Sequence, residues 1–159
     1  MSRHELPAVL HGFPTDADPG RAACDGGAGS VKAGRRDPVM VVDDDPSLRA
    51  SVRRALERRG HAVGEARGGR DALAQLCDGL AVSFIVTDLR MADGSGGWLL
   101  AQLGYDYPHL LERTVVMAGD AAGAAAAHLA ARWHCPVLTK PFSAPQLSGA
   151  LARLGLDDE

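Results

Sequence analysis

From residue 38 onward, short apolar runs alternate with longer segments whose apolar residues recur at helical spacing. Continuous runs such as VMVV at residues 39–42 are typical of strands buried on both faces of a parallel sheet. The predicted strands lie at residues 39–42, 61–66, 82–88, 113–117 and 136–139. The predicted helices lie at residues 46–59, 69–76, 98–103, 119–133 and 143–156. This alternation indicates an α/β protein with a doubly wound, five-stranded parallel sheet and five helices.

Boundary residues support the first of these helices. Asp45 is a suitable N-cap, Pro46 suits the first helical position, and Gly60 suits the end of the helix. The following segment, HAVGEA, is short and partly polar, which predicts a strand at the edge of the sheet.

The first 37 residues differ in composition from the rest of the chain. They contain six glycines and three prolines and show no period of 2 or 3.6. We therefore expect residues 1–37 to form a disordered leader, residues 38–156 a single domain, and residues 157–159 a short acidic tail.

Composition narrows the classes of function. Apolar residues make up 46% of the chain and the formal net charge is -3, which suits a globular core and gives no electrostatic reason to expect nucleic acid as a partner. No apolar run is long enough to span a membrane, and no membrane partner is expected. Cys24, Cys77 and Cys135 lie far apart without metal-ligand spacing, which favours a reducing, cytoplasmic location.

Charged residues follow three of the predicted strands. Asp43 and Asp44 follow the first, Asp88 ends the third, and Lys140 follows the fifth. Because ligands of open α/β sheets bind at the carboxyl ends of the strands, we expect these four side chains to converge. Clustered carboxylates suit Mg²⁺, and a lysine beside them suits a phosphoryl oxygen. A carboxylate can also act as the nucleophile and form an aspartyl phosphate.

Three segments resemble the receiver domain of two-component response regulators: VVDDDPSLR, FIVTDLRMADGSGG and VLTKPF. The resemblance covers residues 38–155 and implies the flavodoxin-like receiver fold. It also implies that Asp88 is the phosphoacceptor and that Lys140 contacts the phosphoryl group. The implied Mg²⁺ site consists of the carboxylates of Asp44 and Asp88, the backbone carbonyl of Arg90, and Asp43, which would act mostly through a bound water. The Lys140–Pro141 peptide would be cis.

The chain departs from the receiver pattern at three positions. Where the family has a serine or threonine at the end of the fourth strand, this sequence has Ala118, and where it has an aromatic residue in the fifth strand, this sequence has Val137. Both halves of the family's usual switch are therefore missing. Ala92 replaces the usual proline after the phosphoacceptor, which we expect to loosen that loop.

The resemblance also implies partners. The donor would be a histidine kinase or a histidine phosphotransfer protein, and the output would be contact with an unknown downstream protein or service as a phosphate relay or sink. The protein would assist its own phosphorylation and dephosphorylation without being an enzyme in the usual sense. The segments MAGDAAG and LTKPF are similar to those of receivers at the C-terminus of hybrid sensor kinases, although we expect a single-domain regulator. The Ala-rich segment at 119–133 would either pair two copies in a homodimer or pack on the sheet.

Two other functions remain open at this point. A haloacid-dehalogenase-type phosphatase would use Asp43, Asp45 and Asp120, although Lys140 follows its late acidic residue instead of preceding it. A receiver-shaped interaction module that is never phosphorylated would agree with Ala118. The intact acidic residues and Lys140 favour a working phosphoacceptor.

Several remaining residues receive structural interpretations. The arginines of the first helix are expected to form a solvated face or part of a partner surface: Arg49, Arg53, Arg54, Arg58 and Arg59. Trp98 and Trp133 are expected to be packing residues at helix ends.

Overall fold

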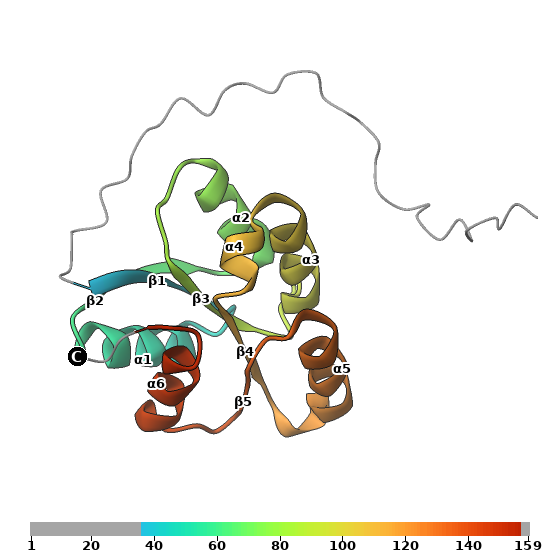
Figure 1. The fold of residues 1–159 in the computed structure, drawn as a ribbon. Coiled ribbons are helices and arrows are strands. Elements are labelled where there is room, and N and C mark those ends of the chain that lie inside the picture. Colours follow the sequence, from blue (N-terminus) through green and yellow to red (C-terminus); the bar gives the residue numbers. More distant parts are fainter. Residues whose placement is uncertain (1–35, 157–159) are drawn as a thin grey trace, which may run out of the picture.

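The computed structural model describes residues 36–156. Five parallel strands form one sheet in the order β2-β1-β3-β4-β5. Their bounds are β1 Arg36–Val42, β2 His61–Ala66, β3 Phe84–Asp88, β4 Thr114–Ala118 and β5 Val137–Thr139. The predicted doubly wound sheet is confirmed, and β2 lies at its edge as HAVGEA indicated (Figure 1).

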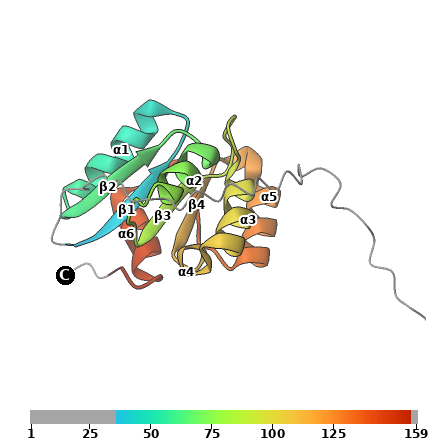
Figure 2. The ribbon, with the colours of Figure 1, turned by 90° about the horizontal axis from the view of Figure 1, so that it is seen from above.

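Helices cover both faces of the sheet (Figure 2). Their bounds are α1 Pro46–Glu57, α2 Gly69–Cys77, α3 Gly96–Asp106, α4 Pro108–Leu111, α5 Gly123–Trp133 and α6 Ala144–Ala152, with a 3-10 turn, η1, at Asp120–Ala122. Buried residues of α1 and α6 pack on one face, and those of α2, α3 and α4 pack on the other. The helix α5 covers the second face near β4 and β5.

The apolar runs fill both layers because successive strand residues point to opposite faces. In β1, Val39 and Val41 belong to the cluster under α1 and α6, whereas Met40 and Val42 belong to the cluster under α2 and α3. All four are fully buried. A strand buried on both faces explains why the run VMVV is continuous and does not alternate with polar residues.

The prediction of five helices was wrong in number, since the described residues contain six and a 3-10 turn. The short α4 was missed because it spans only four residues; it begins at Pro108, a residue suited to the first helical position. The predicted helix at 119–133 is divided into η1 and α5. The predicted helix at 98–103 is longer, because Ser95 accepts a hydrogen bond from the backbone of Trp98 and caps it earlier.

The predicted domain limits can be compared with the structure only in part. The strand β1 begins at Arg36, so two residues of the expected leader belong to the sheet. Residues 1–35 and the expected acidic tail lie outside the described residues. Within the described part, no helix has both the length and the hydropathy that crossing a membrane requires.

Candidate functional site

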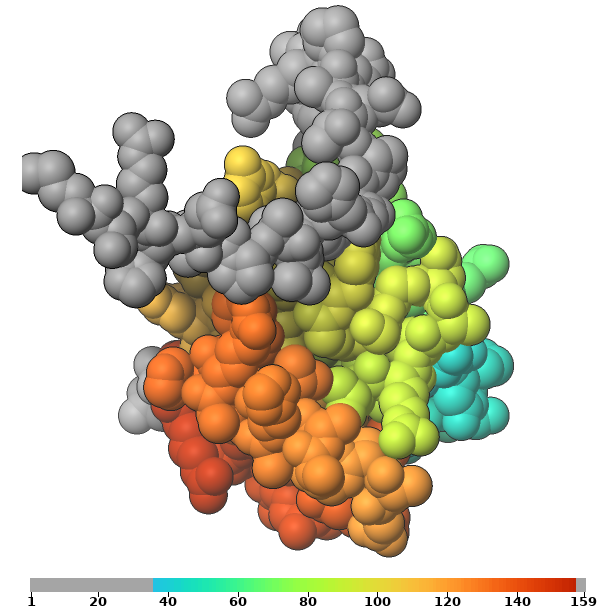
Figure 3. All heavy atoms as spheres, turned by 90° about the vertical axis from the view of Figure 1, so that its right-hand side faces the viewer, coloured from blue at the N-terminus to red at the C-terminus, as the bar shows by residue number. Residues whose placement is uncertain are grey.

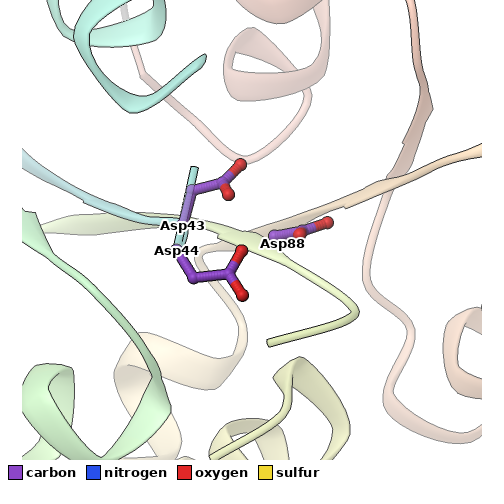
Figure 4. A group of neighbouring side chains, drawn as sticks. All are labelled: Asp43, Asp44 and Asp88. Carbon is purple, nitrogen blue, oxygen red and sulfur yellow. The ribbon is translucent and has the colours of Figure 1, made fainter. Parts of the chain in front are cut away.

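The four predicted residues meet at one edge of the sheet. Asp43 and Asp44 follow β1, Asp88 is the last residue of β3, and Lys140 follows β5. Because all strands are parallel, these positions share the carboxyl edge of the sheet. Figure 4 shows the three carboxylates side by side at the ends of β1 and β3.

Three carboxylates are close enough to share one cation. Oxygen atoms of Asp43, Asp44 and Asp88 all lie within 4.8 Å of one another. Asp43 and Asp88 are buried, and Asp44 is exposed. Like charges at this separation repel each other, so the cluster is suited to a bound divalent ion.

Lys140 provides the positive charge of this cluster. Its Nζ lies 3.0 Å from Oδ1 of Asp88 and 3.5 Å from Oδ2 of Asp43. The lysine side chain is 26% exposed, so it borders both the buried acids and the solvent. An ammonium group in this position can contact a phosphoryl oxygen carried by Asp88.

Asp43 shows the strongest electrostatic cost of the site. Its Oδ1 accepts a hydrogen bond of 2.9 Å from the backbone of Asp45, but its buried Oδ2 has no hydrogen-bond donor. The 3.5 Å contact from Lys140 to this oxygen is an ion pair and too long for a good hydrogen bond. Burial raises the pKa of Asp43 and the charge of Asp88 adds to the rise, although Lys140 and the Asp45 bond oppose it. The carboxylates therefore fit a metal ion that would neutralise them.

Asp45 caps α1 and does not contribute to this cluster. Its carboxylate accepts hydrogen bonds from the backbones of Ser47 and Leu48 at 2.9 and 3.3 Å. This is the capping role that the sequence predicted.

Arg49 is a site residue that sequence reasoning assigned to a solvated or partner-binding face. Its side chain is only 15% exposed, its Nη1 donates 2.7 Å to the Asp43 carbonyl, and its Nε lies 3.2 Å from Oε1 of Glu65. It thereby ties the loop after β1 to the edge strand β2. The position of Arg49 in the first turn after Asp45 was a signal for a role near the site. Its partner Glu65, in β2, is too distant in sequence for a local pattern to reveal the contact.

The loop after Asp88 has an anchor that the sequence did not reveal. The backbones of Gly69 and Arg70, at the start of α2, donate to the carbonyls of Gly94 and Asp93 at 2.8 and 3.3 Å. A Cβ at Gly68 would lie 2.3 Å from the Asp93 carbonyl oxygen, so glycine permits this approach. These bonds fasten the loop in which Ala92 replaces proline.

The two unusual switch positions lie where the sequence placed them. Ala118 ends β4, one residue past the Met117 that pairs with Asp88, and is only 3% exposed. Val137 is half-buried in β5. Neither side chain can donate a hydrogen bond. The Lys140–Pro141 peptide is cis. The guanidinium of Arg90 donates 3.3 Å to the carbonyl of Ala121 in η1.

Comparison with known proteins decides the family. Residues 39–152 match the family described as the response regulator receiver domain. The chain belongs to this family. Receiver domains act as phosphoacceptors in two-component signalling. Membership excludes the dehalogenase-type phosphatase, which would also need Asp45 in the site instead of at the cap of α1.

Two curated relatives of this receiver domain are larger proteins. The sensor kinase CckA of Brucella abortus is 34% identical over 111 residues, or 69% of this chain and 12% of CckA. The photosynthetic apparatus regulatory protein RegA of Rhodobacter capsulatus is 30% identical over 119 residues, or 74% of this chain and 62% of RegA. The chain thus spans less than two thirds of either relative.

Solved structures agree with this assignment. The receiver domain of NtrX from Brucella abortus is 25% identical with a TM-score of 0.65, and the match covers 73% of this chain and 96% of that one. A response regulator receiver domain protein from Clostridium thermocellum shares the fold at 23% identity, with a TM-score of 0.67 and coverage of 74% and 93%.

Proposed function

We propose that this receiver domain takes a phosphoryl group from a phosphohistidine donor onto Asp88, with Mg²⁺ bound by Asp43, Asp44, Asp88 and the backbone carbonyl of Arg90. The observation that carries the proposal is the convergence of the three carboxylates with Lys140, whose Nζ is 3.0 Å from Asp88. A bound Mg²⁺ would neutralise the acids and the charge on the transferring phosphoryl group.

In the proposed reaction, an oxygen of Asp88 attacks the phosphorus atom of the donor. The new P–O bond forms as the P–N bond to the donor histidine breaks, and the released imidazole nitrogen takes a proton from solvent. Lys140 contacts a phosphoryl oxygen during transfer, and it holds the same group in the aspartyl phosphate. Attack by water later releases inorganic phosphate and restores the carboxylate.

A groove next to Lys140 supports a helical protein as the donor. It has a volume of about 420 Å³ between α1 and α6, and its lining is largely apolar: Leu48, Ser51, Val52, Ala55, Arg58, Lys140, Pro141, Phe142, Ala144 and Leu147. A helix that placed apolar residues in this groove would bring its histidine toward Asp88. Arg58 at the rim suits an acidic residue of the donor.

The first test is phosphorylation by acetyl phosphate in Mg²⁺ or in EDTA, followed by intact-mass measurement. We expect a Mg²⁺-dependent gain of one phosphoryl group that hydroxylamine removes and that Asp88→Asn abolishes. Asp78→Asn, which changes an exposed acid at the end of α2, is the matched control and should still be labelled. Because some receivers use only protein donors, a promiscuous histidine kinase and beryllofluoride complete the set. A chain that neither donor phosphorylates and that does not bind beryllofluoride contradicts the proposal.

A second function is favoured by Ala118 and Val137, which remove both halves of the usual switch. In that case the domain would bind its partner without phosphorylation. The absence of phosphorylation by either donor, together with no binding of beryllofluoride, would support this function.

Output through a homodimer is the related proposal, since α5 exposes a group of small residues: Ala124, Ala125, Ala127 and Ala131. Light scattering with and without beryllofluoride tests it, and an unchanged monomer mass in both states would contradict it.

A further inference from the structure

Arg90 links the phosphoacceptor loop to the segment in front of α5. Its guanidinium Nη2 donates a hydrogen bond to the carbonyl of Ala121, which lies in η1. The side chain is exposed, and within residues 36–156 it has no carboxylate partner. Figure 3 shows the loop after β3 (yellow-green) and the η1–α5 segment (orange) side by side on one face.

A phosphoryl group on Asp88 would lack one expected contact in this protein. Lys140 approaches Asp88 from the β5 side at 3.0 Å, but Ala118, on the β4 side, has only a methyl group. The carbonyl of Ala118 accepts a hydrogen bond of 2.7 Å from the backbone of Lys140, and as an acceptor it cannot bond a phosphoryl oxygen. A phosphoryl group brings additional negative charge and three strong acceptor oxygens. Without a donor at Ala118, we expect another donor to bind one of these oxygens.

We propose that Arg90 supplies the phosphoryl contact that Ala118 cannot, and that its departure from Ala121 transmits phosphorylation to η1 and α5. This inference rests on the proposed function. It concerns how the phosphorylated state is held and transmitted, whereas the carbonyl of Arg90 concerns the metal.

The position of Arg90 permits this exchange. Its Cα is two residues from that of Asp88, at most about 7.6 Å away, within reach of a long arginine side chain. Its bond to Ala121 is a single contact of 3.3 Å to a neutral carbonyl. A guanidinium can make two charge-assisted bonds to a phosphoryl group, and such bonds are about twice as strong as neutral ones. The difference between the two partners favours transfer of the guanidinium to the phosphoryl group.

The η1–α5 segment is suited to respond. The start of α5 has no side-chain cap, and Ala126 is the one residue of this helix that is fully buried. The Arg90 bond therefore adds to the core contacts of this segment, which come from Ala122 in η1 and from Ala126, Leu129 and Trp133 in α5. Its loss is expected to increase local opening of the backbone there.

Beryllofluoride on Asp88 can stand in for the phosphoryl group in the test. The variants are Arg90→Ala and Arg90→Lys, with Arg67→Ala as the control because Arg67 is also an exposed arginine at the carboxyl edge of the sheet. We expect beryllofluoride affinity, in saturating Mg²⁺, to fall about tenfold in Arg90→Ala, less in Arg90→Lys, and less than twofold in Arg67→Ala. Because the backbone carbonyl of Arg90 belongs to the proposed metal site, the Mg²⁺ affinity of each variant is measured first, and each beryllofluoride titration is run at a Mg²⁺ concentration that saturates that variant.

Hydrogen exchange provides the second readout. In the wild type, beryllofluoride should increase amide exchange in residues 119–127. In Arg90→Ala, exchange in the same residues should already be high without beryllofluoride and should not change when it is added. Wild-type affinity or a wild-type exchange response in Arg90→Ala overturns the inference and leaves the proposed function intact. A wild type that binds neither beryllofluoride nor phosphate contradicts both.

Discussion

Asp43 shows how much of this site depends on charge balance at a single residue. It is fully buried, one of its oxygens lacks a hydrogen-bond donor, and Asp88 lies beside it. Lys140 compensates only in part, because the pKa of Asp43 is still raised. A carboxylate with this environment is arranged for binding a cation and not for the stability of the metal-free fold.

Asp43→Asn should therefore stabilise the metal-free protein near neutral pH, because the raised pKa of Asp43 means that its charged form is disfavoured in the folded state. Because the pKa of Asp43 is raised in the folded state, its contribution to the unfolding free energy of the wild type is most favourable below the unfolded-state pKa. That contribution is lost as the pH rises through the folded-state pKa. The asparagine cannot titrate, so its advantage should disappear toward pH 4. Urea unfolding in EDTA across about pH 4–8 measures this difference.

Asp37→Asn is the control for that experiment, since Asp37 is exposed at the other end of β1. It should have little effect at any pH. A variant Asp43→Asn that is less stable than wild type at every pH would show that the pairing with Lys140 outweighs the cost of burial.

At the scale of the elements, the start of α2 and the loop after β3 form one unit. The unit depends on glycines at which a side chain would collide with backbone atoms. Gly94 has φ of +74°, and a Cβ there would lie 2.8 Å from the backbone nitrogen of Arg70. Arg70 adds a contact over the ring of Trp98 and an ion pair of 3.5 Å with Asp93. The predicted packing role of Trp98 is confirmed, because its side chain packs against the core cluster under α2 and α3.

Gly94→Ala should destabilise the protein by about 1–3 kcal/mol, because both the positive φ and the approach to α2 oppose a Cβ. Gly149→Ala is the matched control: it lies inside α6, and a Cβ there would meet nothing within 4 Å. This control should gain up to about 1 kcal/mol from helix propensity. Denaturant unfolding measures the unfolding free energy of both variants. A Gly94→Ala variant as stable as Gly149→Ala would mean that the loop accommodates the added Cβ without cost.

The elements also show which predictions the sequence can support. The start of α1 was found from its local signals at Asp45 and Pro46. The start of α3 was placed two residues late in spite of the cap at Ser95, and α4 was missed because four residues carry too little periodicity. The convergence of Asp88 and Lys140 was predictable because parallel strands align their carboxyl ends. The contacts of Arg49 with Glu65 and of Gly68 with Asp93 were not, since they join residues that no local pattern relates.

At the scale of the whole molecule, the sheet brings together charges that are far apart in the chain. Core residues on both faces fix the strands, and the strand ends then fix the carboxylates, so the acidic cluster is a consequence of the fold. A cation that binds only this folded arrangement must stabilise it. The fold and the candidate metal site are thus linked thermodynamically, and unfolding can report on binding.

Mg²⁺ should raise the unfolding free energy of the wild type by about 2.7 kcal/mol at a concentration one hundred times its dissociation constant. Asp44→Ala tests whether the carboxylates cause this effect. Asp44 is exposed, so its removal should leave the metal-free stability nearly unchanged and should reduce the Mg²⁺-dependent gain to a small fraction. Thermal unfolding over a Mg²⁺ titration at constant ionic strength separates binding from screening. Equal gains in both proteins would mean that Mg²⁺ acts elsewhere on the surface, and the acidic cluster would then not be the metal site.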